Sequence, residues 1–124
     1  MTQQSHRSSQ DAVDLPDLLE RVDNDHDFLC ELIGLFKEEF PPVLQSLKQS
    51  VVREDVKKVE VTSHALKGML SELSVTRAAA IASRLEQLGR DGETSGMTET
   101  LALLEHEVAN LFPELDGYAA EAKP

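Results

Sequence analysis

Residues 28–47 read FLCELIGLFKEEFPPVLQSL, a stretch in which apolar residues recur every three or four positions. This spacing places an apolar stripe along one side of an α-helix, and it predicts a long amphipathic helix that begins at Asn24 or Asp25. Pro41 and Pro42 fall inside it, where we expect a kink or break because proline lacks a backbone donor and crowds the preceding turn. The stripe consists of Phe28, Leu29, Leu32, Leu35, Phe36, Phe40, Val43, Leu44 and Leu47.

Helical spacing extends over most of the remaining chain. Asp14 is the predicted N-cap of a short N-terminal helix. Gly89 or Gly92 suits the end of a later helix, and Pro113 ends or bends the last one. No segment alternates apolar and polar residues for long enough to be a strand. The predicted fold class is therefore all-α, an antiparallel four-helix bundle with a short extra N-terminal helix. The three helices expected after the long one lie at about 53–73, 76–89 and 101–113.

The 124 residues suffice for one domain. Residues 1–12 are polar and are expected to be a disordered leader or linker, whereas residues 13–113 carry the helical pattern. Residues 114–124 are expected to form a tail with little to bury. Both ends resemble cuts in a longer polypeptide, and we expect the domain to come from a hybrid sensor kinase rather than to be a free protein.

The composition excludes several classes of function. The formal net charge is -11, so the surface repels nucleic acids and anionic membranes. No apolar stretch approaches the ~18 residues of a membrane span. Cys30 is the single cysteine and cannot form an internal disulfide, which fits a reducing compartment. We therefore expect a cytoplasmic domain with neither nucleic-acid binding nor membrane insertion.

Residues 63–71 read SHALKGMLS and contain the candidate chemistry. At about 100° per residue, His64 lies about 120° from the centre of the apolar stripe and is expected to be exposed. Lys67, Gly68 and Ser71 follow at helical spacing and share its face. An exposed imidazole is a nucleophile, and a lysine one turn away can stabilise a phosphoryl group in transfer. In an exposed helix, glycine at position 68 lowers helix stability by about 1 kcal/mol relative to alanine. Its missing side chain leaves room for another protein's active site.

This stretch resembles the motif of the histidine phosphotransfer (HPt) domains of multistep two-component phosphorelays. Their pattern is a histidine, two residues and Lys-Gly, present here as His64-Ala-Leu-Lys67-Gly68. The resemblance extends over about residues 14–111. It includes a Phe-x-x-x-x-Pro stretch at Phe36–Pro41 and a Leu-Glu-x-x-Gly-Arg stretch at Leu85–Arg90.

The resemblance implies that His64 accepts a phosphoryl group from a receiver-domain aspartate and passes it to another receiver. Lys67 would assist electrostatically, and Gly68 would give clearance for docking. Family members often place a Glu or Gln of the neighbouring helix near the imidazole, which suggests Glu86 or Gln87. Helix phase alone does not choose between them.

The chain also departs from the family pattern. Small residues and then a Gly-Ala pair near the helix end usually follow the motif, whereas this chain has Met69-Leu70 and Ser74-Val75. Ser74 can cap the following helix. The departures leave the turn geometry and the shape of the docking face open.

The expected partners are receiver domains of response regulators or hybrid kinases. Magnesium is expected in the partner receiver, and no cofactor is expected in this chain. The predicted docking surface contains Val61, Ala65 and Met69, which are apolar yet outside the core stripe, together with Ser71. Neither Gly-x-x-x-x-Gly-Lys nor Gly-x-Gly-x-x-Gly occurs, so we expect a phosphocarrier domain rather than an enzyme, and any nucleotide site would belong to a parent histidine kinase.

Two alternative functions remain open. One is a helical module that docks receivers without transferring phosphate. The other is the phosphoacceptor domain of a chemotaxis-type kinase, in which a kinase domain phosphorylates the histidine. The phosphoryl donor distinguishes them.

Other polar residues are interpreted as structural. His26 lies among Asp23, Asp25 and Asp27, but these acids suit the positive start of the long helix, and no metal site is predicted. Cys30 falls on the apolar side of that helix and is expected to be buried. His106 is expected on a solvated face, and His6 lies in the leader.

Overall fold

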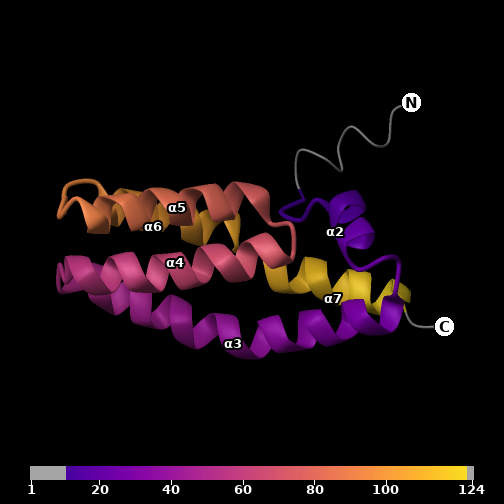
Figure 1. Ribbon diagram of the computed structural model, residues 1–124. Coiled ribbons are helices and arrows are strands. Elements are labelled where there is room, and N and C mark those ends of the chain that lie inside the picture. The colour runs from indigo at the N-terminus through magenta and orange to yellow at the C-terminus, as the bar shows by residue number, and fades with distance from the viewer. Residues whose placement is uncertain (1–10, 123–124) are drawn as a thin grey trace.

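The computed structural model of the protein describes residues 11–122, and every regular element in that range is a helix. The helices are α2 (Leu15–Arg21), α3 (His26–Val52), α4 (Val56–Glu72), α5 (Thr76–Arg90), α6 (Met97–Glu107) and α7 (Leu111–Ala122). In Figure 1, α3 runs the length of the molecule, and α4 lies along its C-terminal half while α7 lies along its N-terminal half. The predicted all-α bundle with a short extra N-terminal helix is confirmed, with its last helix divided into α6 and α7.

Aspartates begin three of the helices. The carboxylates of Asp14, Asp25 and Asp55 each accept a hydrogen bond from the backbone N–H of the third residue of α2, α3 and α4, respectively. These bonds satisfy donors that have no partner within the helix. The N-cap predicted at Asp14 is therefore present, and of the two predicted starts of the long helix Asp25 is the cap.

The long helix α3 is continuous through Pro41 and Pro42, so of the predicted kink or break the break is absent. Both prolines are exposed, and on that side of the helix water can satisfy the carbonyl groups that lose a partner. On the buried side, the rings of Phe36 and Phe40 stack with centroids 4.7 Å apart. The ribbon of α3 is bowed along its length in Figure 1.

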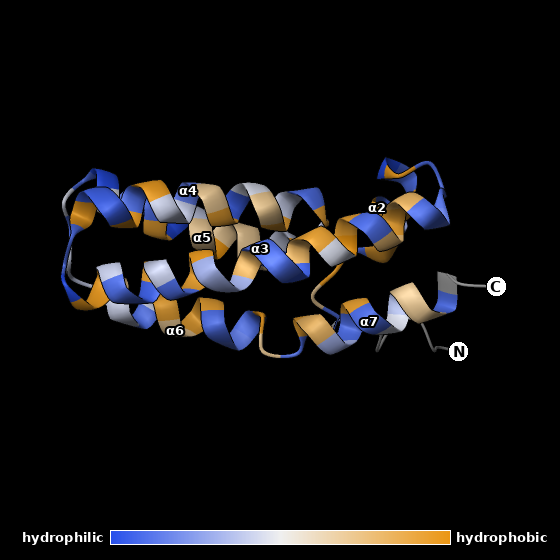
Figure 2. Cartoon of the chain, turned by 90° about the horizontal axis from the view of Figure 1, so that it is seen from below, coloured by the Kyte–Doolittle hydropathy of each residue, from blue (hydrophilic) through white to orange (hydrophobic). Residues whose placement is uncertain are grey.

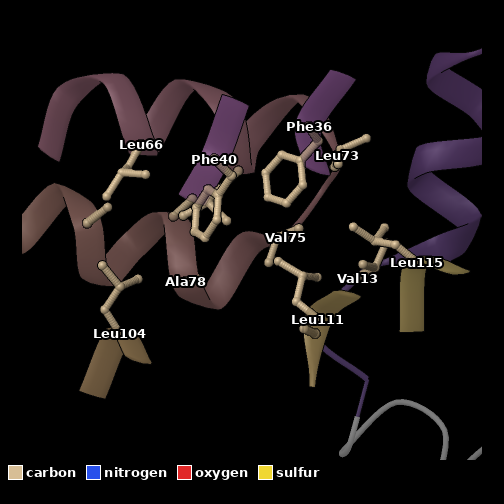
Figure 3. Close-up of a cluster of buried hydrophobic side chains, with 14 of the residues drawn as sticks. Val13, Phe36, Phe40, Leu66, Leu73, Val75, Ala78, Leu104, Leu111 and Leu115 are labelled. Carbon is tan, nitrogen blue, oxygen red and sulfur yellow. The ribbon is translucent and has the colours of Figure 1, made fainter. Parts of the chain in front are cut away.

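Every helix contributes buried apolar residues to the core, and most of these residues are aliphatic. Orange and blue segments alternate along the helices in Figure 2, as amphipathic helices require. Figure 3 shows Phe36 and Phe40 of α3 gathered with buried side chains of other helices. Burying each large apolar side chain stabilises the folded state by about 1.5–3 kcal/mol. The side chains labelled in Figure 3 include Leu66 of α4, Ala78 of α5 and Leu104 of α6.

The C-terminal part differs from the sequence expectation. The last helix ends at Glu107, before Pro113, and a new helix begins at Leu111. Pro113 lies in the first turn of α7, where its missing N–H has no helical partner to lose. Residues 114–122, expected to be tail, continue α7 because Leu115 is fully buried in the core.

The segment before α2 also belongs to the folded part. Ala12 and Val13 are buried, and their backbone N–H groups donate to the carboxylate of Glu114 at 2.9 and 3.1 Å. Ala12 was expected in the leader, so the folded region begins slightly earlier than predicted. None of the helices within residues 11–122 combines the length and apolar character that a membrane span requires.

Candidate functional site

His64 lies in the middle of α4 with its side chain 69% exposed. Its neighbours Ser63 and Leu66 are buried against the rest of the bundle. Because the two sides of the helix are so different, the imidazole is held on a well-packed helix while its ring remains accessible. The exposure predicted from helix phase is therefore observed.

Glu86 of α5 is the residue that reaches the imidazole. Its Oε2 lies 3.0 Å from Nδ1 of His64. Gln87 instead bonds Asp91 at 3.0 Å and Arg90 at 3.2 Å. Helix phase left both residues open, and the packing of α4 against α5 turns Glu86 toward the histidine.

The Glu86 side chain is only 8% exposed, and two cationic side chains donate hydrogen bonds to its carboxylate. Lys67 Nζ lies 2.7 Å from Oε1, and the Arg90 guanidinium lies 2.9 Å from Oε2. The hydrogen bond from Lys67 lowers the pKa of Glu86 below its usual value, and the bond to His64 acts in the same direction, while burial opposes both. The carboxyl group is therefore ionised at neutral pH.

This ionisation fixes the tautomer of a neutral His64 ring. An ionised carboxylate only accepts hydrogen bonds, so Nδ1 carries the proton that lies between the two residues. The lone pair then belongs to Nε2, the other ring nitrogen. Within residues 11–122, Nε2 has no hydrogen-bond partner.

An open hollow of about 280 Å³ lies beside the imidazole. Its lining combines charged groups with one exposed apolar residue, Val61, whose exposure is 55%. Gly68 lies one turn beyond His64, and a Cβ atom there would meet no atom of the described residues within 4 Å. The hollow is lined by Lys57, Glu60, Val61, His64 and Glu86.

The sequence matches the family model described as Hpt domain over residues 31–113. This chain belongs to the Hpt domain family. Hpt domains are the phosphotransfer domains of two-component signalling, phosphocarriers without a catalytic nucleotide site. The resemblance inferred from the motif around His64 is thereby confirmed at the level of the family.

A solved structure supports the fold of this Hpt domain. The fold of this chain is similar to that in the crystal structure of histidine-containing phosphotransfer protein B (HptB) from Pseudomonas aeruginosa PAO1, with a TM-score of 0.81 and 21% sequence identity. The similarity covers 88% of this chain and 95% of that chain. No curated protein sequence matches significantly.

The predicted docking residues of the Hpt domain differ in exposure. Val61 and Ala65 are exposed on the same side of α4 as His64. Met69 is half-exposed and packs against the edge of the core, outside the fully buried cluster. Ser71 is also half-buried. The exposed apolar surface next to the imidazole is therefore formed by Val61 and Ala65.

Gly89 and Arg90 are important residues whose contacts the sequence did not reveal. Gly89 was expected only as a helix end, but it lies against α4, where Arg90 also bonds Glu60 at 3.2 Å. The similarity of Leu85–Arg90 to the family pattern was the available signal. A pattern gives no distances, so it could not show which side chains would meet.

The turn between α4 and α5 replaces the family's usual Gly-Ala with Ser74-Val75. Ser74 does not cap α5, whose N-cap Val75 makes no side-chain cap bond. Instead Ser74 adopts φ +58° and its hydroxyl donates to Asp17 of α2 at 2.7 Å. This bond, and a second from Arg21, lower the pKa of Asp17. The predicted cap is wrong because the left-handed turn directs the hydroxyl toward α2.

The remaining candidates lie apart from His64. His26 is exposed at the start of α3, and residues 11–122 contain no group of three potential metal ligands. Cys30 is half-buried, with Sγ 3.8 Å from the carbonyl oxygen of Ala119. His106 is exposed on α6 as expected. His6 lies outside the described residues.

Proposed function

We propose that this Hpt domain is a phosphorelay intermediate that accepts a phosphoryl group on His64 from a receiver-domain aspartate and passes it to another receiver. The observation that supports this best is the pairing of an exposed imidazole with an ionised, buried carboxylate at Nδ1. This pairing leaves the nucleophilic lone pair on Nε2, where a partner can approach it.

The transfer step follows from this geometry. The Nε2 lone pair forms a bond to phosphorus while the bond between phosphorus and the aspartate oxygen breaks, and the aspartate leaves as a carboxylate. The ring becomes positively charged as it gains the phosphoryl group. Glu86, at 3.0 Å from Nδ1, stabilises that charge and retains the Nδ1 proton in its hydrogen bond. Transfer to a second receiver reverses the same step.

Lys67 is proposed to assist the transfer electrostatically. Glu86 holds its ammonium group one helical turn from His64, where a positive charge favours the approach of phosphoryl oxygens. We propose that this chain needs no cofactor of its own, and that the magnesium ion belongs to the receiver.

Receiver domains of response regulators or hybrid kinases are the proposed partners, and the cytoplasm is the proposed place of action. Val61 and Ala65 provide apolar contact next to the imidazole. An alanine at Gly68 would meet none of residues 11–122, so we infer that a need for glycine there comes from a docking partner. These features favour a surface that another protein covers during transfer.

The test is phosphoryl transfer from purified receiver domains that carry radiolabelled phosphate. We expect acid-labile, base-stable label on the wild-type domain and none on His64→Gln. His106→Gln is the matched control, since it removes another exposed histidine and should keep full labelling. Equal labelling of His64→Gln would contradict the proposal. Binding without transfer would support a docking module instead, and labelling only by ATP with a kinase domain would support the chemotaxis-type alternative.

A further inference from the structure

Arg90 connects the two carboxylates that border the imidazole. One of its terminal guanidinium nitrogens lies 2.9 Å from Oε2 of Glu86, and its Nε lies 3.2 Å from Oε2 of Glu60. The Oε2 atom of Glu86 is also the one that contacts His64 at 3.0 Å. Arg90 and His64 therefore share a single acceptor oxygen.

We propose that Arg90 is a positioning residue that favours the neutral, nucleophilic form of His64 by offsetting the negative charge of Glu86. The inference rests on the proposed phosphoacceptor role of His64. A carboxylate next to an imidazole stabilises the protonated ring, which has no lone pair on Nε2. A cation on the same carboxylate oxygen weakens that effect.

The charges around His64 come from the two helices that border it. Lys57, Glu60 and Lys67 lie on α4, and Glu86 and Arg90 lie on α5. Among the residues that the structure describes, these five amount to three cations and two anions, which is one net positive charge. Without Arg90 they would be neutral, and a protonated ring would be less disfavoured.

Burial gives this charge arrangement its strength. Ion pairs in full contact with water contribute little because water screens them. Glu86 is only 8% exposed, and Arg90 is anchored at a second point by Glu60, which is 23% exposed. The guanidinium group is therefore held against the carboxylate, although Arg90 itself is half-exposed.

The direct test is an NMR titration of the His64 ring nitrogens, with signals assigned by comparison with His64→Gln. We expect Arg90→Gln to raise the pH of half-protonation by about 0.5 of a unit, as expected for losing one unit charge several ångströms away. Arg84→Gln is the matched control, because Arg84 is an exposed arginine on α5 that lines a different hollow with Leu103. It should leave the midpoint unchanged, and Arg90→Lys should restore most of the wild-type value. No shift in Arg90→Gln, or an equal shift in Arg84→Gln, would overturn the inference.

A double-mutant cycle tests whether Arg90 acts through Glu86. In a Glu86→Gln background the carboxylate charge is absent, so adding Arg90→Gln should shift the His64 midpoint much less than it does in the wild type. An equal shift in both backgrounds would show that Arg90 acts on the ring independently of Glu86, contrary to the inference.

The titration requires no phosphoryl donor, so it separates this inference from the proposed function. If the midpoint moves as expected but the domain accepts no phosphate, the inferred effect of Arg90 on protonation holds and the relay function fails. If the domain is phosphorylated on His64 but the midpoint does not move, the function holds and the inference fails. If both the function and the inference hold, the rate of phosphoryl acceptance should fall at low pH as His64 becomes protonated. In Arg90→Gln, the pH at which this rate is half-maximal should rise by the same amount as the His64 midpoint in the titration.

Discussion

Gly89 of α5 lies so close to Glu60 of α4 that a Cβ atom at position 89 would be 2.7 Å from the Glu60 backbone nitrogen. It would be equally close to the carbonyl oxygen of Val56. Both are backbone atoms and cannot turn aside as a side chain would. The close crossing lies one turn from Glu86, so it helps to set the distance at which Glu86 meets His64.

Gly89→Ala should therefore destabilise the domain. Separating the helices should cost about 1–3 kcal/mol, against which alanine gains up to about 1 kcal/mol in helix propensity. Urea unfolding measures the net change. Gly34→Ala is the matched control, because Gly34 is exposed in α3 with open space at its Cβ position and should become more stable. Equal stabilisation of both variants would show that the crossing accommodates a side chain.

Gly68→Ala, unlike Gly89→Ala, should stabilise the domain but slow phosphoryl transfer. Nothing in the described part of the chain lies within 4 Å of the added methyl group, so stability should rise by about 0.5–1 kcal/mol. Transfer from a phosphorylated receiver should nevertheless slow by about tenfold, equivalent to about 1.4 kcal/mol, because the methyl group occupies space left for the partner. Rapid-quench transfer assays measure the rate, with Gly34→Ala as the control that gains stability without losing transfer. An unchanged rate in Gly68→Ala would remove the proposed clearance.

The sequence predicted the parts of this structure that depend on local pattern. Apolar spacing predicted the helices and the exposure of His64, and Asp14 was found as a cap because capping depends on nearby residues. The pattern left open whether α3 would bend or break at Pro41, since that outcome depends on which side of the helix faces water. It also missed α7, where Leu115 is buried by contacts with residues distant in sequence.

The same distinction applies to the site. His64 and Lys67 lie on one helix, so their spacing was sufficient to place them on one face. Choosing Glu86 over Gln87 required the rotation of α5 relative to α4, which helix phase within one segment does not define. The contacts of Arg90 likewise join two helices and become visible only once those helices are packed.

Val61→Glu should weaken receiver docking. Val61 is 55% exposed and lines the hollow beside His64, so a carboxylate there would face the acidic active site expected of a receiver. We expect transfer at subsaturating receiver concentration to slow by about tenfold, or about 1.4 kcal/mol, with little change in stability. Val52→Glu adds the same charge at a valine that is 82% exposed at the end of α3, outside that hollow. Equal slowing in both variants would indicate a general charge effect instead of a local contact.

Ser74 offers a test of the turn before α5. Ser74→Ala should cost about 1–2 kcal/mol, because it removes the hydrogen bond to Asp17 and leaves the strain at φ +58° unrelieved. Ser74→Gly loses the same bond but relieves about 1 kcal/mol of strain in the left-handed conformation. Thermal and urea unfolding should therefore rank wild type and glycine above alanine. Alanine at least as stable as glycine would contradict the account of the turn.

The ionisation of Glu86 predicts how stability depends on pH. Contact with Lys67 and His64 lowers the folded-state pKa of Glu86 below its ordinary value of 4.5. A carboxyl with a lowered folded-state pKa contributes stability that is fully present above its unfolded pKa and is lost as pH falls through the folded value. Glu86→Gln should therefore be less stable than wild type by about 1–3 kcal/mol at pH 7, as expected for losing hydrogen bonds to a charged group. Urea unfolding from pH 7 to pH 3 should show this gap narrowing below about pH 4.5. A gap that stays constant, or one that widens in acid, would mean that Glu86 is not held ionised by its partners.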